Sequence, residues 1–317
     1  MDESTVLRVL CILFSGLIVA TNFTICVLVS LRKSMRTYTN GFVVSLAFSD
    51  MLIGSLLLPA SLFLPDSSRA LGYVVSITLL SGVFNVACVT FDRCIAVLKA
   101  LQYESFMRKN FARMICSSWL AAVAISLIPL LWGTDTTKLE HKIFVLAELT
   151  FCVLLPYTLI FVGYIKIFQQ VRRSLQRERE ITASVRNTMQ RKSSISSEAK
   201  LAQVFIIVAL MFVLSWLPIH YITIVYEIGR KDLIPQSLRI ASLFTVALGS
   251  LINPIVYSFL KPDFRKSIRQ IFCPNKRRRF GRNKKFVRGG SSHLSTATSS
   301  LKTRLTINSK NAADTRV

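Results

Sequence analysis

The sequence predicts an all-α membrane protein: a bundle of seven transmembrane helices followed by a short amphipathic eighth helix. The first reason is composition, since 52% of the 317 residues are hydrophobic and 18% are charged. That is too apolar for a disordered chain or an ordinary soluble enzyme. The second reason is that the apolar residues lie in seven long runs. The third is that Lys and Arg gather on alternate connections between these runs.

Each apolar run is long enough to cross a membrane, because about 20 helical residues span roughly 30 Å of hydrocarbon. Lipid offers no hydrogen-bond partners, so each run must be helical, and the short alternating strands of a barrel are excluded. Two runs contain one acid each, Asp50 in the second and Glu148 in the fifth. In chain order the runs are residues 9–31, 41–64, 70–91, 114–133, 143–165, 201–226 and 240–260.

The basic residues predict the orientation of the bundle. With the amino terminus outside, 33 of the 40 Lys and Arg residues fall on the inner connections and the tail, as the positive-inside rule requires. A net charge of +24 would indicate nucleic acid as the partner of a soluble protein. Beside a membrane it predicts instead attraction to anionic membrane lipids and to an intracellular partner, with no nucleic acid.

These boundaries divide the chain into four parts. They are a short extracellular N-terminus (1–8), the bundle (9–260), an amphipathic segment (261–272) and a basic, Ser/Thr-rich cytoplasmic tail (273–317) that is expected to be disordered. The first run has no basic n-region and no small-residue cleavage site, which favours a retained signal anchor. In the amphipathic segment, Phe264 and Ile268 alternate with basic residues, which predicts a helix lying on the membrane. The polar loop after the fifth run is expected to extend its flanking helices.

Every span also carries a polar or proline signature. In order these are Gly16 and Asn22; Leu46, Ala47, Phe48, Ser49 and Asp50; Asp92, Arg93 and Cys94; Trp119; Pro156 and Tyr164; Phe212, Ser215, Trp216, Leu217 and Pro218; and Asn253, Pro254, Ile255, Val256 and Tyr257. Each signature is unspecific alone, but one in every span, in this order, is specific. From about residue 16 to 272 the chain resembles the rhodopsin-like (class A) G-protein-coupled receptors, with a weaker resemblance to the adenosine and melanocortin receptors among them.

The resemblance implies a plasma-membrane receptor with its N-terminus outside and its C-terminus in the cytoplasm. Such a receptor passes an extracellular chemical signal to a heterotrimeric G protein by outward movement of the sixth helix, and it is not an enzyme. Two alternatives from other classes stay open. A transporter or channel would need interrupted helices and several midplane charges, and a third interpretation is a constitutively active or scaffolding seven-helix protein.

Asp50 is the deepest charged residue of the sequence. An acid alone in an apolar helix is costly, so Asp50 is expected to face the bundle interior among polar partners. The alternative is a protonated carboxyl that serves only packing. The resemblance implies an allosteric sodium ion here and no other cofactor. Asn22, Ser250 and Asn253 are available to contribute, whereas two usual helper positions of the family are Gly82 and Gly249 here, which counts against tight sodium binding.

A second set of residues is expected to switch the receptor. In the family, an arginine such as Arg93, beside Asp92, pairs with an acid such as Glu198 to hold the inactive state, then releases it to contact the G protein. A partly buried ion pair is weak evidence for stability but makes a two-state latch. The alternative is a snorkelling arginine and a solvated acid. Tyr164 and Tyr257 are expected to share a water bridge in the open state.

Prolines mark candidate hinges in this set. Pro156, Pro218 and Pro254 each remove a helix hydrogen bond and loosen the helix. Phe212, Trp216 and His220 are spaced four residues apart, which places them on one face of the sixth helix. The full set of predicted switch residues is Asp92, Arg93, Glu198, Tyr164, Phe212, Pro218, Asn253, Pro254 and Tyr257.

The outer half of the bundle is expected to hold a ligand cavity with an apolar lining and few polar anchors. The predicted lining residues are Val75, Leu79, Glu148, Cys152, Trp216 and His220. Glu148, Cys152 and Pro156 are spaced four apart and are expected on one face of the fifth helix. Glu148 can accept from a cationic or polyhydroxylated ligand, and His220 can donate or accept. Alternatively the two pair with each other, or Glu148 reaches water.

Departures from the family pattern reduce the number of agonist classes that fit this sequence. Val75 stands where aminergic receptors carry an aspartate, and Ala247 stands where retinal-binding members carry a lysine, so both identities are disfavoured. Ser68 stands at the outer end of the third span in place of the cysteine of the usual disulfide. Melanocortin, cannabinoid and lysophospholipid receptors also lack that bond. The agonist is therefore left as a small molecule, a lipid or a peptide.

The tail carries candidate modification sites. Cys273 follows the amphipathic segment among basic residues, which is typical of a palmitoylated cysteine. The predicted phosphorylation sites are Ser291, Ser292, Ser295, Thr296, Thr298, Ser299 and Ser300. Each phosphate would add about −1.5 to −2 charge, and the resemblance implies that arrestin binds the phosphorylated tail.

Overall fold

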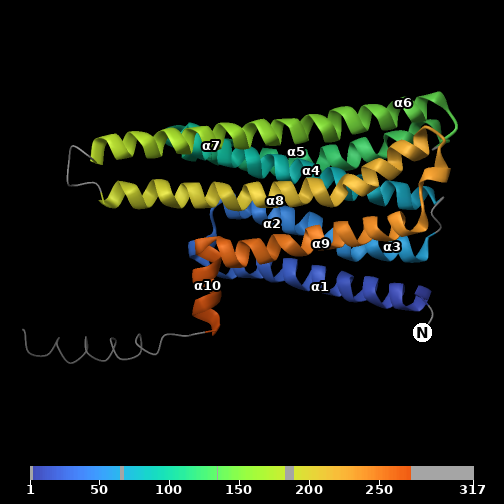
Figure 1. Cartoon of the computed structure of the whole chain (residues 1–317), viewed down its shortest axis with the longest axis horizontal. Helices are drawn as coiled ribbons and strands as arrows, with labels where there is room; N and C mark the ends of the chain where they lie inside the picture. The colour runs from blue at the N-terminus through green and yellow to red at the C-terminus, as the bar shows by residue number, and fades with distance from the viewer. Residues whose placement is uncertain (1–2, 65–67, 134, 183–188, 273–317) are drawn as a thin grey trace, which may run out of the picture. The chain divides into compact units, whose positions relative to one another are not determined.

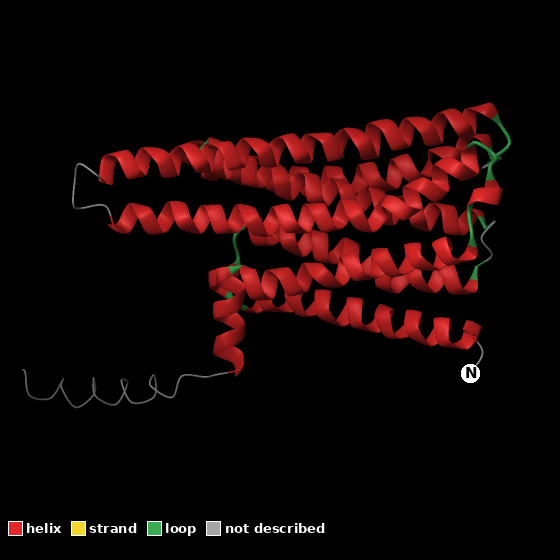
Figure 2. Ribbon diagram, in the orientation of Figure 1, coloured by secondary structure: helices red, strands yellow, loops and turns green. Residues whose placement is uncertain are grey.

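The structure is a computed structural model that describes residues 3–64, 68–133, 135–182 and 189–272, and in these ranges it contains helices and no strand. Figures 1 and 2 show the helices as long, mostly parallel or antiparallel rods. Seven of the described helical segments are long and apolar enough to cross a membrane. The predicted all-α class and seven-helix bundle are confirmed.

The first four spans follow the predicted order with shifted ends. The first is α1 (Glu3–Leu31) and the third is α4 (Arg69–Leu98). The second consists of α2 (Tyr38–Leu52), a π-helix (Ile53–Leu57) and α3 (Leu58–Phe63). The fourth is α5 (Ala100–Leu127), which continues into a 3₁₀ turn (Ile128–Trp132). It begins well before the apolar run at residue 114, because the basic connection is itself helical.

The remaining spans carry a second π-helix. The fifth span consists of α6 (Leu139–Ala147), a π-helix (Glu148–Leu154) and α7 (Leu155–Thr182). The sixth is α8 (Met189–Glu227) and the seventh is α9 (Gln236–Leu260). Helices α7 and α8 pack against each other, and Figure 1 shows them side by side. Both extend beyond the apolar runs, as expected for the polar segment between the fifth and sixth runs.

Both π-helices end two residues before a proline, Pro59 in the second span and Pro156 in the fifth. A proline has no N–H to donate, and its ring clashes with the carbonyl four residues earlier. Widening the preceding turn moves that carbonyl away from the ring, since π-type turns insert into α-helices as local bulges. Pro156, predicted as a hinge, thus also changes the rotation of the residues before it, and Pro59 does the same in the second span.

The third span is the centre of the bundle, because α4 packs against α2, α5, α7 and α8. In addition, α1 packs against α2 and α9, α9 packs against α8, and α8 packs against α7, so the spans form one connected set of neighbours. Large apolar side chains such as Leu13, Leu120 and Phe161 stay exposed on the outside. That exposure suits lipid, where close packing rather than the hydrophobic effect holds helices together.

Two glycines allow the sixth helix to approach its neighbours closely. A Cβ atom on Gly82 of α4 would lie 2.6 Å from the Phe212 ring of α8, and one on Gly249 of α9 would lie 2.6 Å from the Ser215 hydroxyl of α8. Both distances are well inside van der Waals contact, so these helix pairs pack at this spacing only because glycine stands there. Small residues at helix interfaces are the usual device for close packing in membranes.

By its contacts the chain divides into two units, Met1–Arg265 and Lys266–Val317. The bundle belongs to the first unit. Helix α10 (Pro262–Phe272) covers the predicted amphipathic segment, while its position on a membrane surface stays a prediction. Cys273 and the predicted phosphorylation sites Ser291, Ser292, Ser295, Thr296, Thr298, Ser299 and Ser300 lie outside the described residues.

Candidate functional site

Glu148 lies in the fifth span at the start of the π-helix, and its carboxylate faces the third span. Ser76 of α4 donates a hydrogen bond of 2.5 Å to Glu148 Oε1. The same Ser76 hydroxyl lies 2.8 Å from the hydroxyl of Ser126 on α5. A hydroxyl has one proton to give, so Ser126 donates to Ser76 while Ser76 donates to Glu148. The acid is therefore the end of a three-residue polar chain that joins three spans.

The expectation that Glu148, Cys152 and Pro156 share one helix face stays a prediction. Glu148 and Cys152 both lie within the π-helix Glu148–Leu154, whose wider turn changes the rotation of these residues relative to Pro156. Cys152 remains half-buried on the same segment, and Val75 and Leu79 lie on α4 beside Ser76, half-buried and buried respectively. The predicted cavity residues of the third and fifth spans are thus linked by the hydrogen bond between Ser76 and Glu148.

His220 lies on α8 and is buried next to the fifth span. Its Nε2 atom is 3.3 Å from the hydroxyl of Tyr157 on α7, and the two rings are 6.0 Å apart. Tyr157 also packs edge-on against Phe212, with ring centroids 6.3 Å apart. The structure gives Glu148 and His220 different hydrogen-bond partners, Ser76 and Tyr157, so it does not show the pairing of the two with each other.

Trp216 and Phe212 form the buried middle of α8. Trp216 is 1% exposed, and its ring centroid lies 6.2 Å from that of Phe212. Phe212 lies against Gly82 of α4, as described above. Pro218 lies inside the continuous helix between Trp216 and His220. The structure therefore brings the predicted aromatic residues together on one face and places the candidate hinge among them.

Asp50 is buried in the second span and bound to the seventh. Its Oδ2 atom accepts a 2.7 Å hydrogen bond from Asn253 Nδ2, and the Ser250 hydroxyl is a second hydrogen-bond partner. Asn22 of α1 donates to the Ser250 carbonyl oxygen at 3.3 Å. The four residues predicted for a sodium site thus form one connected group. Pro254 lies inside α9 directly after Asn253.

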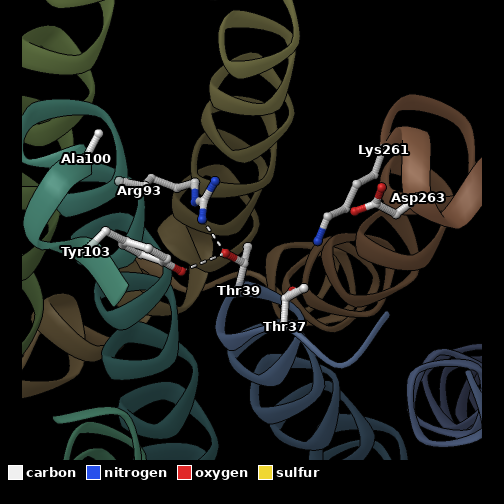
Figure 3. A pocket seen from close by; sticks show the side chains of 8 residues that line it. Thr37, Thr39, Arg93, Ala100, Tyr103, Lys261 and Asp263 are labelled. Carbon is white, nitrogen blue, oxygen red and sulfur yellow. Dashed lines mark hydrogen bonds between the residues drawn. The ribbon is translucent and has the colours of Figure 1, made fainter. Parts of the chain in front are cut away.

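At the other end of α4, Asp92 and Arg93 form a buried polar cluster. Asp92 Oδ2 accepts from the Arg93 guanidinium at 2.7 Å and from the Thr39 hydroxyl at 2.9 Å, and Asp92 Oδ1 accepts from the Tyr103 hydroxyl at 2.8 Å. Arg93 also donates to Thr39. Thr39 comes from α2 and Tyr103 from α5, so three helices hold the arginine (Figure 3).

The other predicted switch residues at this end of the bundle are Tyr164, Tyr257 and Glu198. Tyr164 of α7 and Tyr257 of α9 are both buried and close enough to interact electrostatically. Glu198 belongs to the backbone of α8, but its side chain lies outside the described residues. The latch between Arg93 and Glu198 therefore stays a prediction.

Sequence reasoning missed Ser76, Ser126 and Tyr157 near the outer half, and Thr39, Tyr103, Asn40 and Lys261 near Arg93. The first three are polar residues in apolar spans, but nothing in their spacing identifies their partners. Lys261 follows directly after the seventh apolar run, and by sequence alone it is one of the inner basic residues. In the structure it is 1% exposed and its ammonium donates to Asn40 Oδ1.

The connection after the fourth span is tied to the third without a disulfide. Arg69, the first residue of α4, donates a 3.2 Å hydrogen bond to the carbonyl oxygen of Gly133. In the same connection the Asp135 carboxylate accepts from the Thr137 hydroxyl at 2.7 Å and from its N–H at 3.0 Å. These donors hold the pKa of Asp135 below its usual value. The six cysteines among the described residues are free thiols.

Comparison with known proteins agrees with this arrangement. Residues 21–257 match the family model of the 7 transmembrane receptor (rhodopsin family). The adenosine receptor A2b of Mus musculus is 28% identical over 298 residues, which cover 82% of this chain and 87% of that receptor. A GQ-coupled rhodopsin of Mizuhopecten yessoensis is 27% identical, covering 80% and 57% of the two chains, and galanin receptor type 1 of Mus musculus is 26% identical, covering 75% and 72%.

Proposed function

Because this chain belongs to the rhodopsin family of seven-transmembrane receptors, we propose that it carries an extracellular chemical signal across the plasma membrane by outward movement of α8. The chain is a multi-pass membrane protein of a family that signals through heterotrimeric G proteins. The basic excess supports an orientation with the N-terminus outside and the Arg93 end of the bundle in the cytoplasm, where the G protein is available.

The observation that carries the proposal is the position of α8. One helix holds Trp216 and His220 on the side of the predicted ligand cavity, Phe212 against the central helix, and Glu198 toward the Arg93 end. Pro218 weakens the helix among these contacts. A ligand that moves Trp216 or His220 therefore acts on a loosened segment. Outward swing of the inner part of α8 requires Phe212 to leave Gly82.

The inner end supplies the two-state element. We propose that Glu198 pairs with Arg93 when α8 lies inward, and that the outward swing breaks this pair. Arg93 already has Asp92 and Thr39 as partners on its own side, so it stays satisfied when Glu198 leaves. A latch of this kind costs little to open, because the arginine is not left as an unpaired buried charge.

For the ligand we propose a small polar molecule that presents hydrogen-bond donors to Glu148. The acid is held by one neutral donor, Ser76, and a cationic or hydroxylated ligand would make a stronger bond to a carboxylate in this apolar setting. His220 and Tyr157 offer a second polar contact on α7 and α8. Because one relative is by name an adenosine receptor, nucleosides are the first compounds to test, ahead of peptides and lipids.

A sodium ion beside Asp50 is a further part of the proposal, and the residues present fit it in part. The carboxylate, the Ser250 hydroxyl and the amide oxygens of Asn22 and Asn253 are the ligand type that sodium takes, and both amide oxygens are buried without a hydrogen-bond partner. Gly82 and Gly249 contribute no side-chain oxygen, and Phe212 and Ser215 pack against them instead. Bound sodium would supply positive charge that balances Asp50.

At the tail we propose that Cys273 is lipid-anchored, that α10 lies on the membrane, and that arrestin binds after phosphorylation of the hydroxyl cluster. Palmitate on Cys273 would add a second anchor to a surface helix, which one anchor alone holds only weakly. Metabolic labelling with a palmitate analogue, with Cys273→Ser as the control, tests the first of these. Label that persists in Cys273→Ser would contradict it.

The central test is nucleotide exchange on purified G proteins by the receptor in lipid nanodiscs, with a nucleoside-centred ligand library. Arg93→Ala should abolish exchange while surface expression remains, and Glu198→Ala should raise basal exchange. Arg113→Ala is the matched control, because Arg113 is an exposed arginine on α5 whose guanidinium donates to the Lys109 carbonyl oxygen of its own helix. Exchange in Arg93→Ala at the level of Arg113→Ala would overturn the latch.

A further inference from the structure

A cavity of about 320 Å³ opens at the Arg93 end of the bundle, and Figure 3 shows the side chains that line it. Two of them are cationic, Arg93 from α4 and Lys261 from the junction of α9 and α10. Three are hydroxyls, from Thr37, Thr39 and Tyr103. The cavity thus offers two positive charges and the Thr37 hydroxyl, while the Thr39 and Tyr103 hydroxyls already donate to Asp92. Two cations lining one cavity suit an anion with several oxygen acceptors.

Lys261 is held in an unusual environment for a lysine. Its side chain is 1% exposed, its ammonium donates to Asn40 Oδ1, and it lies 5.2 Å from the centre of the Phe264 ring. The charged groups that face it are Arg93 and Asp92 on α4 and Asp263 on α10. Burial and the positive charge of Arg93 lower the pKa of Lys261 from 10.5 to about 7, although the two acids act in the opposite direction. Lys261 is therefore a cation whose charge a bound anion would stabilise.

The two acids near the cavity, Asp92 and Asp263, do not take the place of an anionic ligand. Asp92 already accepts from Arg93, Thr39 and Tyr103, which use both of its oxygens. Asp263 is exposed at the rim. An anion that enters between Arg93 and Lys261 would meet one planar guanidinium, one ammonium and the Thr37 hydroxyl, which is a combination that binds phosphate oxygens.

We infer that this cavity binds a phosphate group, carried either by a soluble phosphate monoester or by the headgroup of a phosphorylated lipid, and that the bound phosphate holds Arg93 in its inward position. The inference rests on the proposed function, because holding Arg93 matters only if its release is part of activation. A bound phosphate would bridge α4 and the α9–α10 junction. It would therefore oppose activation from the cytoplasmic side, independently of the agonist cavity.

The first experiment measures binding with sulfate, because sulfate keeps its two negative charges across the neutral pH range. The full-length receptor in phosphatidylcholine nanodiscs is melted in the presence of a thiol-reactive dye, which reports the buried and half-buried cysteines as they become exposed. Sodium chloride at equal ionic strength is the reference. Sulfate at ten times its dissociation constant should raise the melting temperature by about 3 °C, and an equal shift with chloride would overturn the inference.

Sulfate binding should weaken as the pH rises and Lys261 loses its proton. A lysine with a pKa of about 7 is protonated in about nine-tenths of molecules at pH 6 and about one-tenth at pH 8. Sulfate should therefore bind about tenfold more weakly at pH 8 than at pH 6. Lys261→Met should lose the sulfate shift, whereas Lys261→Arg should keep it with no pH dependence. A pH dependence that persists in Lys261→Arg would contradict the role of Lys261.

Two variants keep the test decisive if Lys261→Met does not fold. Asp263→Asn removes a negative charge from the rim and should tighten sulfate binding. Arg265→Gln is the matched control, because Arg265 is an exposed cation one turn further along α10, and it should bind sulfate as the wild type does. Loss of most of the sulfate shift in Arg265→Gln would show nonspecific charge attraction and refute the site.

The source of the phosphate is separated in two arms. Inositol trisphosphate added to phosphatidylcholine nanodiscs tests the soluble source, and nanodiscs with about 5% phosphatidylinositol bisphosphate test the lipid source, against phosphatidylserine at equal total charge. Stabilisation in either arm that is lost in Lys261→Met supports the site, and none in both arms overturns it. The stabilising compound should also lower basal nucleotide exchange severalfold. If nucleotide exchange is measurable but does not respond to phosphate, this inference is wrong and the proposed function stands. If nucleotide exchange is absent while the sulfate shift is normal, the proposed function is wrong.

Discussion

Gly82→Ala tests the claim that α8 is held inward by the seating of Phe212 on the third span. The added methyl would lie 2.6 Å from Phe212 Cε2 and 2.8 Å from Cζ, whereas ordinary contact begins near 3.4 Å, so the ring must retreat by about 0.8 Å. Phe212 is 5% exposed and packed between Trp216 and Tyr157. A close-packed interior has no free space for that retreat, and overpacking of this kind costs about 1–3 kcal/mol.

That strain falls on the inward state alone if the outward swing removes Phe212 from Gly82. The ratio of outward to inward molecules should then rise by roughly 5- to 150-fold. Basal nucleotide exchange at matched receptor concentration, measured without agonist, reports this ratio. Gly72→Ala is the control on the same helix, because a Cβ at Gly72 meets nothing within 4 Å, and it should leave basal exchange unchanged.

The double variant Gly82→Ala with Phe212→Leu should return basal exchange toward that of Phe212→Leu alone, since the smaller side chain leaves room for the methyl. The reasoning is refuted if folded Gly82→Ala keeps the wild-type basal level, or if Gly72→Ala raises it as much. A basal level that stays high in the double variant would mean that the added methyl acts elsewhere than on Phe212.

Three further predictions concern the polar groups within the spans. Ser76→Ala removes the present partner of Glu148 and should raise the potency of a donor-bearing agonist about three- to tenfold. Glu148→Gln should lower that potency by at least tenfold, since a hydrogen bond to a charged group contributes about 1.5–3 kcal/mol. Dose–response curves that show equal potency for the two variants would contradict the role of Glu148 as a ligand anchor. Tyr157→Phe removes the hydrogen bond to His220 and should lower the melting temperature by about 2–4 °C, with Tyr221→Phe, an exposed tyrosine on α8, as the control that should not melt earlier. Replacing choline chloride with sodium chloride should lower agonist affinity fivefold or less, as expected for a site that lacks two oxygen ligands, and a sodium effect that survives Asp50→Asn in radioligand binding would place the ion elsewhere.

The order of the spans could be predicted from the sequence because it depends on features that are local in the chain. Hydropathy and length give the seven runs, and basic residues such as Arg113 and Lys166 mark their inner ends. The motif residues Arg93, Trp216 and Asn253 could be named because the family resemblance assigns positions to them. Each of these inferences needs only a residue and its neighbours in sequence.

The partners of the site residues could not be predicted, because they depend on the rotation of one helix against another. Ser76 and Ser126 are small hydroxyl residues of a kind common in membrane helices, and only packing brings them to Glu148. The π-helix before Pro156 changes the direction in which Glu148 and Cys152 point, although the proline itself was a visible signal. Lys261 looked like any basic residue at a membrane boundary, and its burial follows only from the turn between α9 and α10.

The Arg69–Gly133 contact has a practical consequence for the outer mouth. The connection after the fourth span is held to α4 by a hydrogen bond that water can replace, and none of the described cysteines forms a disulfide. Dithiothreitol should therefore leave the mouth intact, and synthesis in a cell-free lysate, where thiols stay reduced, should yield correctly folded material without an oxidising step or an isomerase.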